Sequence, residues 1–177
     1  MDSYITVRHR TFISFYHKDD QFYKEELERK WGNVIINESV RDGEYNSDDS
    51  DAYIKRLIRE DKISYSSVIV VLVGPNTKAR KHVDWEIYAG LRDSVNGSSG
   101  LVGIILPEIL TKDGKYYQSD LPARLADNVA SGYAKVYAWD YAIRNFPTIV
   151  DEAFKDRLDL RDKKTNNRKQ MKINTGS

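Results

Sequence analysis

The sequence predicts an α/β fold in which a five-stranded parallel sheet carries helices on both faces. Apolar, strand-like runs alternate along the chain with amphipathic helical segments. The central runs, residues 68–73 (VIVVLV) and 101–106 (LVGIIL), are continuously apolar, as is typical of parallel strands buried on both faces. Alternating strands and helices form right-handed βαβ units. We therefore predict a flavodoxin-like three-layer sandwich with strand order 2-1-3-4-5.

The predicted strands share short runs of apolar, β-branched or aromatic residues and cover residues 11–16, 33–36, 68–73, 101–106 and 135–139. The predicted helices run from Asp19 or Asp20 to Trp31, over 48–64, over 77–96, from about Pro122, and over 145–158. An Asp at the first helix start is a good N-cap, and Gly32 is a natural stop. Pro147 lies in the first turn of the last predicted helix, where proline is tolerated.

Length and composition indicate one domain with a tail. The chain has 177 residues, enough for a single sizeable core. We place the domain at residues 1–160 and a basic tail at 161–177, which has six Lys or Arg and one Asp. Few apolar residues and a charge surplus predict a solvated, flexible tail. The rest of the chain is then net acidic.

The composition excludes several classes of function. The chain has no cysteine, three histidines and a net charge of +1. No disulfide framework, thiolate site or histidine metal-ligand spacing follows from these residues. The charge balance argues against a nucleic-acid partner, and no apolar run has the length of a membrane span. With no signal-peptide pattern at the N-terminus, we expect a cytoplasmic domain without a metal.

The strand ends are where an open α/β sheet binds ligands, and familiar motifs are missing there. No G-x-G-x-x-G, G-x-x-x-x-G-K-[ST] or G-x-S-x-G motif occurs, which argues against dinucleotide, P-loop and α/β-hydrolase sites. The third strand is followed by Val73-Gly-Pro-Asn76, without the aspartate of a receiver domain.

Glu86 is the candidate that remains. On a helical wheel it lies on the flank of the apolar stripe, beside the small residues Ala79 and Gly90, which would leave space over the carboxylate. A carboxylate there would point toward the ligand crevice. The alternative is a surface Glu paired with Lys81 or Arg80.

Two motifs carry a family resemblance. Residues 11–19 (TFISFYHKD) resemble the first strand and loop of TIR domains, and residues 74–86 (GPNTKARKHVDWE) are similar to the TIR pattern S-P-N-F-x-x-S-x-W-C-x-x-E. Together with residues 53–58 and 67–74, they look like the ThsB-type TIR-like family of the Thoeris antiphage system. The resemblance covers about residues 10–158.

The resemblance implies a flavodoxin-like fold and an activity. Family enzymes cleave the nicotinamide–ribose bond of NAD and often cyclise the remaining ADP-ribose into a signalling nucleotide, with NAD as substrate and no cofactor. In these family enzymes the Glu at the position of Glu86 is the catalytic residue, so the resemblance implies that role for Glu86. A fixed carboxylate suits the oxocarbenium-like ribose that forms when nicotinamide leaves.

Further site residues follow from the same resemblance. Ser14, Phe15, Tyr16 and Asp19 would contact the nicotinamide riboside half of the substrate, and Asp49 would meet a ribose. The aromatic residues could instead belong to the core, and each Asp could simply cap a helix.

Two positions differ from the family pattern. His82 stands where the pattern has Trp, and Arg80 stands where it has Ser. His82 is one helical turn from Glu86, so it could stack on the substrate, tune the carboxylate, or be a polar surface residue. Trp85 points about 100° away from Glu86 and is a poor substitute for the missing Trp.

Two other functions stay open at this stage. The chain could be a non-catalytic TIR-type adaptor that self-associates, for example through the loop over residues 37–47. It could also resemble nucleoside deoxyribosyltransferases, which use a carboxylate at an N-glycosidic bond. If the chain is an NAD-cleaving enzyme, we expect NAD as its direct partner and a nucleotide-sensing effector as an indirect partner.

Overall fold

A computed structural model describes residues 8–37, 60–94 and 97–176 of the chain. The helix predicted over 48–64 is therefore described only from residue 60, and residues 60–64 are helical. The rest of that helix, residues 38–47 of the predicted loop, and Asp49 lie outside the described residues.

The described elements follow the predicted alternation of strands and helices. The strands are β1 (His9–Ser14), β2 (Ile35–Asn37), β3 (Val68–Val73), β4 (Gly100–Ile105) and β5 (Lys135–Ala138). The α-helices are α1 (His17–Trp31), α3 (Lys81–Leu91), α4 (Ala123–Ala130) and α5 (Trp139–Asp159). Short 3-10 helices are η2 (Thr77–Ala79), η3 (Pro107–Ile109), η4 (Gln118–Asp120) and η5 (Arg161–Lys163). None of the helices in the described residues combines the length and apolarity that crossing a membrane requires.

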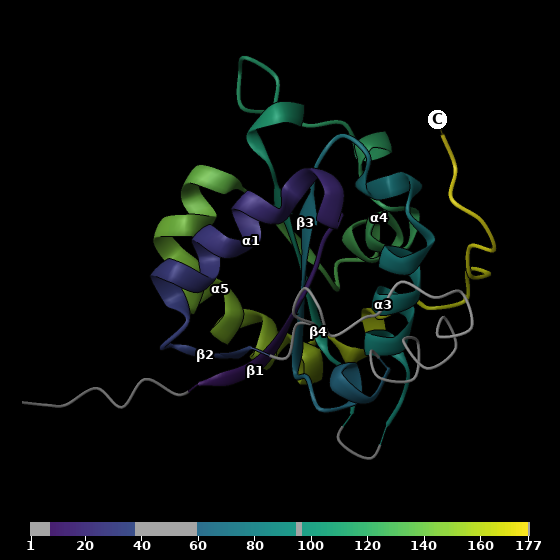
Figure 1. Cartoon of the computed structure of the whole chain (residues 1–177). Coiled ribbons are helices and arrows are strands. Elements are labelled where there is room, and N and C mark those ends of the chain that lie inside the picture. The colour runs from purple at the N-terminus through teal and green to yellow at the C-terminus, as the bar shows by residue number, and fades with distance from the viewer. Residues whose placement is uncertain (1–7, 38–59, 95–96, 177) are drawn as a thin grey trace, which may run out of the picture.

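The sheet confirms the predicted fold class. Its five strands are all parallel and are ordered β2-β1-β3-β4-β5. Helices α1 and α5 cover one face, and α3 and α4 cover the other (Figure 1). The central strand β3 is fully buried because its alternate side chains enter both cores. Val68, Val70 and Leu72 pack on the α1 and α5 side, whereas Ile69, Val71 and Val73 pack on the α3 and α4 side.

Helix α1 begins earlier than its predicted aspartate cap. Its N-cap is Tyr16, which makes no side-chain cap hydrogen bond, and the Tyr16 carbonyl oxygen accepts from the backbone N–H groups of Asp19 and Asp20. Both acids thus lie in the first turn, where negative charge favours the helix dipole. The predicted stop is correct, because Gly32 is the C-cap.

The helix predicted over residues 77–96 is shorter and has two parts, η2 and then α3. The helical wheel indicates that Gly90 leaves room beside Glu86, but in the structure it does not. A Cβ at Gly90 would lie 2.5 Å from Cγ1 of Ile69. The glycine instead lets α3 pack closely on β3.

Helix α5 begins six residues before the predicted start at Asn145. Asn145 has non-helical backbone angles (φ −125°, ψ 20°) and joins two helical parts. The prediction therefore found the second part, in which Pro147 occupies an early position that needs no i−4 hydrogen bond.

The C-terminal end was predicted to be frayed and solvated; residues 167–169 and 172–176 are exposed, but the backbone of residues 164–176 is hydrogen-bonded to the domain. This segment runs beside α3 and α4 (Figure 1, yellow). The backbone N–H of Thr165 donates to Asn128 Oδ1, and that of Met171 donates to Asp84 Oδ2. Its basic composition was the basis of the prediction, but polar side chains on α3 and α4 bind its backbone and hold it in place.

Candidate active site

The carboxyl ends of β1 and β3 lie next to each other, because Ser14 at the end of β1 pairs with Val71 near the end of β3. The chain leaves these ends through residues 15–17 and residues 74–80. Parallel α/β sheets bind ligands at this edge. The residues that the two motifs contribute are therefore close together in space.

Glu86 lies in the middle of α3 and is buried, with 5% of its surface exposed. The alternative of a surface Glu is therefore wrong. Removing a carboxylate from water costs free energy, and buried carboxylates of this kind concentrate at functional sites. His82 precedes it by one helical turn on the same helix.

His82 connects α3 to the end of β1. Its Nε2 lies 3.1 Å from the backbone carbonyl oxygen of Phe15. A carbonyl oxygen can only accept, so Nε2 carries the proton in this contact. The His82 ring centroid also lies 6.2 Å from that of His17 and 6.5 Å from that of Tyr16.

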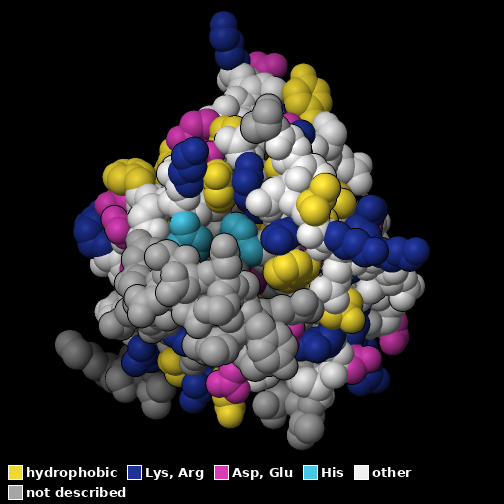
Figure 2. Space-filling view, turned by 45° about the vertical axis from the view of Figure 1, so that its right-hand side comes forward, with side chains coloured by type: hydrophobic (Ala, Val, Ile, Leu, Met, Phe, Trp, Pro, Cys, Tyr) yellow, Lys and Arg dark blue, Asp and Glu magenta, His cyan; other side chains and the backbone are white. Residues whose placement is uncertain are grey.

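Arg80 completes this group from the loop before α3. The central carbon of its guanidinium lies 4.3 Å from the centroid of the Tyr16 ring, a cation–π contact. We name Tyr16, His17, Arg80 and His82 the strand-end cluster. Figure 2 shows histidine side chains at the surface of this face, with Lys and Arg side chains around them.

The other predicted residues at the end of β1 are more deeply buried. Ser14 is fully buried, and within the described part of the chain its Oγ has no hydrogen-bond partner. The Phe15 ring is 2% exposed and belongs to the core on the α1 and α5 side. The structure thus favours the alternative of a core residue for Phe15, although its ring centroid lies 4.1 Å from that of His17 and its carbonyl group contacts His82.

Asp19 is exposed and does not cap α1. Its Oδ2 accepts a hydrogen bond of 2.7 Å from Asn76 Nδ2. The contact ties the first turn of α1 to the loop between β3 and α3. Asp19 thus joins the two motifs directly, whereas Asp49 lies outside the described residues.

Two residues at the edge of the candidate site, Asp20 and Thr77, were not identified from the sequence. Asp20 is 2% exposed, and Thr77 Oγ1 lies 3.4 Å from Asp20 Oδ2 and accepts from the Gly74 N–H. The pKa of Asp20 is raised to about 6, mainly by burial and then by the charges of Asp19 and Glu108, while the hydrogen bond with Thr77 opposes the increase. The consecutive acids were visible in the sequence, but nothing there distinguished the buried one.

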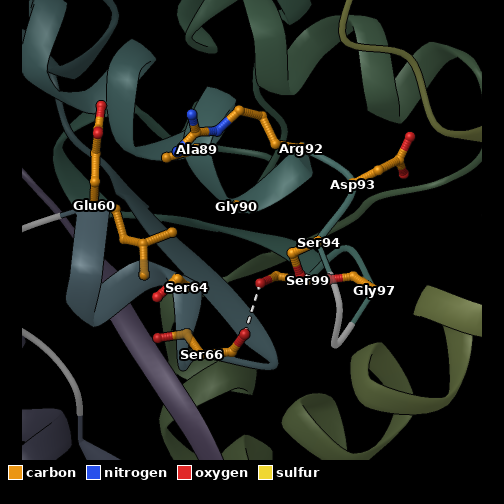
Figure 3. Close-up of a pocket in the computed structure, with 11 residues that line it drawn as sticks. Glu60, Ser64, Ser66, Ala89, Gly90, Arg92, Asp93, Ser94, Gly97 and Ser99 are labelled. Atoms are coloured by element: carbon orange, nitrogen blue, oxygen red, sulfur yellow. Dashed lines mark hydrogen bonds between the residues drawn. The ribbon is translucent and has the colours of Figure 1, made fainter.

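The pockets among the described residues lie away from the strand-end cluster. One of about 190 Å³ lies between the amino ends of β3 and β4 and the end of α3, where Ser99 Oγ donates to the Ser66 carbonyl oxygen (Figure 3). Glu60, Arg92 and Asp93 line its rim. It is thus at the amino ends of the strands, away from the strand-end cluster. The described residues contain no cluster of side chains suited to a metal ion.

Comparisons with known proteins identify one family. The profile of the TIR-like domain of the Thoeris protein ThsB matches residues 12–109, which include the end of β1, the strand-end cluster and Glu86. No curated protein matches the chain. Among solved structures, the flavoenzyme NAD(P)H:acceptor oxidoreductase FerB from Paracoccus denitrificans is similar at 12% identity and a TM-score of 0.47, over 84% of this chain and 97% of that one. The family match covers more than half of the sequence, and the chain belongs to the ThsB TIR-like family of the Thoeris antiphage defence system.

Proposed function

We propose that the protein cleaves the nicotinamide–ribose bond of NAD and converts the remainder into a cyclic ADP-ribose-type signalling nucleotide. The observation that carries this proposal is the buried Glu86 carboxylate, one turn from a histidine that contacts the end of β1. A chain of the ThsB TIR-like family with a carboxylate in this position has the group that the chemistry needs.

In the proposed reaction the bond between nicotinamide nitrogen and ribose C1′ breaks, and both bonding electrons leave with nicotinamide. Positive charge then develops on the ribose, and the Glu86 carboxylate stabilises it in a water-poor environment. A water molecule can add at C1′ and lose a proton, giving ADP-ribose. A nitrogen of the same substrate's adenine can add instead, giving a cyclic product, if the site holds it in line.

We assign substrate binding to the strand-end cluster. Arg80 supplies positive charge for the substrate's pyrophosphate, and Tyr16 and His82 offer flat rings for nicotinamide. The Ser14 hydroxyl, which has no hydrogen-bond partner among the described residues, and the Asp19 carboxylate are further polar groups for ribose hydroxyls. Because the chain without its basic tail is net acidic, we expect these local groups to hold the dinucleotide, without long-range attraction.

A second candidate is a non-catalytic TIR-type adaptor that acts by self-association. One observation favours it: His82, which replaces the family Trp, hydrogen bonds with the Phe15 backbone, so its Nε2 is not available to a substrate. In the enzyme proposal the product passes to a nucleotide-sensing effector, and both act in the cytoplasm.

The products distinguish these candidates. The purified protein is incubated separately with NAD and with a purine deoxynucleoside plus a second base, and products are identified by mass spectrometry. Extracts from phage-infected cells serve as the source of a trigger. Release of nicotinamide supports the proposal, base exchange supports a deoxyribosyltransferase, and two unchanged substrates with and without extract support the adaptor.

A further inference from the structure

Residues 164–176, which we name the C-terminal segment, follow α3 from one end to the other. Near the end of α3, the Lys164 ammonium pairs with Asp93. At the start of α3, the backbone N–H of Thr175 donates to the Ala79 carbonyl oxygen at 2.9 Å. Figure 1 shows the yellow segment beside this helix. The segment thus contacts the same helix that carries His82 and Glu86.

The middle of the segment is attached through a buried ion pair. Asp84 on α3 is 4% exposed and Arg124 on α4 is fully buried. Asp84 accepts from Arg124 Nε at 2.9 Å and from Arg124 Nη2 at 3.3 Å, and its Oδ2 also accepts from the Met171 N–H at 2.8 Å. The indole N–H of Trp85 donates to the Met171 carbonyl oxygen. These contacts bind the backbone of the segment, so they fix its path along α3.

The segment then caps the N-terminus of α3. The first N–H groups of a helix have no partner inside the helix, and the N-cap residue Arg80 makes no side-chain cap bond. The N–H of Lys81 donates instead to Asn174 Oδ1 at 3.0 Å. Asn174 is distant in sequence, so a cap that helices normally obtain locally comes here from the C-terminal segment.

This cap acts on the turn that carries the site. Arg80 immediately precedes α3 and His82 is its second residue, and both belong to the strand-end cluster. A frayed first turn would release the His82 contact with Phe15 and the Arg80 contact with Tyr16 together. We propose that Asn174 is a positioning residue, which holds the first turn of α3 and thereby the strand-end cluster in place for the reaction.

The effect on the reaction rests on the proposed function, so the experiment includes readouts that need no activity. The full-length variants are Asn174→Ala, Asn174→Asp and, as a matched control, Asn167→Ala, at an exposed asparagine of the same segment. The readouts are amide hydrogen exchange in the first turn of α3 and the imidazole NMR signals of His82. The chain has only three histidines, and His9, which pairs with Asp151, is an internal reference. Steady-state cleavage of NAD gives kcat and KM.

For Asn174→Ala we expect about fivefold faster exchange in this turn, the usual consequence of losing an N-cap, and a shifted His82 signal with an unchanged His9 signal. We expect the KM for NAD to rise about fivefold with less than a twofold change in kcat, because the cluster that the first turn of α3 positions is the one assigned to substrate binding. Asn174→Asp should restore the wild-type exchange rate, His82 signal and kinetic constants, since aspartate is an equally good cap. Asn167→Ala should change none of these.

Unchanged exchange and an unchanged His82 signal in Asn174→Ala would overturn the proposal. So would faster exchange with an unchanged KM, or an Asn174→Asp variant that behaves like Asn174→Ala. If the wild-type protein cleaves no NAD, the proposed function fails, and the positioning role is still decided by the His82 signal and its rescue by aspartate.

Discussion

The buried carboxyl group of Asp20 should lower the stability of the protein at neutral pH. Burial, together with the charges of Asp19 and Glu108, raises its pKa from 3.8 to about 6. The folded protein therefore binds this proton more tightly than the unfolded chain does. The resulting stabilisation is fully present below the unfolded pKa and is lost as the pH rises through about 6.

The magnitude follows from the shift. A change from 3.8 to about 6 corresponds to at most about 3 kcal/mol of the free energy of unfolding. Asparagine has nearly the same shape and no charge, and Thr77 Oγ1 lies 3.4 Å from Asp20 Oδ2, within reach of the amide. We expect Asp20→Asn to raise the free energy of unfolding by about 2 kcal/mol at about pH 7.5, and by about 0.5 kcal/mol at about pH 4.

Urea unfolding followed by circular dichroism at these two pH values measures the effect. Asp113→Asn, at an exposed position after β4, is the matched control and should change stability by less than about 0.5 kcal/mol at either pH. An Asp20→Asn variant that is less stable than the wild type at neutral pH would refute the reasoning. An equal gain at both pH values would refute the assignment of the gain to the lost charge.

Three further outcomes follow from named contacts. Asp84→Ala leaves the fully buried Arg124 without its ion-pair partner and should lower the free energy of unfolding by about 3–5 kcal/mol, measured by urea titration; a loss below about 1 kcal/mol would contradict this. Gly100→Ala places a Cβ 2.2 Å from the Ala153 carbonyl oxygen, so α5 must move away from β4, and we expect a loss of about 2–3 kcal/mol in the same assay; a stability equal to that of the wild type would show that the two elements separate freely. Arg80→Ala removes the guanidinium from the strand-end cluster and should raise the KM for NAD about tenfold with little change in kcat; a changed kcat with an unchanged KM would assign Arg80 to the chemical step.

The sheet could be predicted from the sequence because its signals are local. The run from Val68 to Val73 is apolar at every position, and the strand has those bounds. Segments whose structure depends on distant residues were predicted poorly. Nothing within the C-terminal segment itself shows that Asn128 and Asp84 bind its backbone, so its basic composition predicted a solvated tail.

In the candidate site, too, local features could be predicted from the sequence, whereas contacts with distant residues could not. Helical spacing placed Glu86 at the edge of the apolar stripe of α3, and the residue is buried there. Spacing could not show that Gly90 contacts Ile69 or that the Phe15 ring enters the core on the other face. Asp20 was missed because its burial depends on the loop that contains Thr77, which is far away in sequence.

The central claim is that the Glu86 carboxylate drives cleavage of the nicotinamide–ribose bond. The most direct measurement is the initial rate of nicotinamide release from NAD, under the conditions that activate the wild type. Glu86→Gln keeps the shape of the side chain and removes its charge, and Glu25→Gln, at an exposed position on α1, is the control. We predict that Glu86→Gln lowers the rate at least about a hundredfold, the size expected for losing electrostatic stabilisation of the transition state, while Glu25→Gln keeps it. A Glu86→Gln enzyme that releases nicotinamide at the wild-type rate would contradict the account.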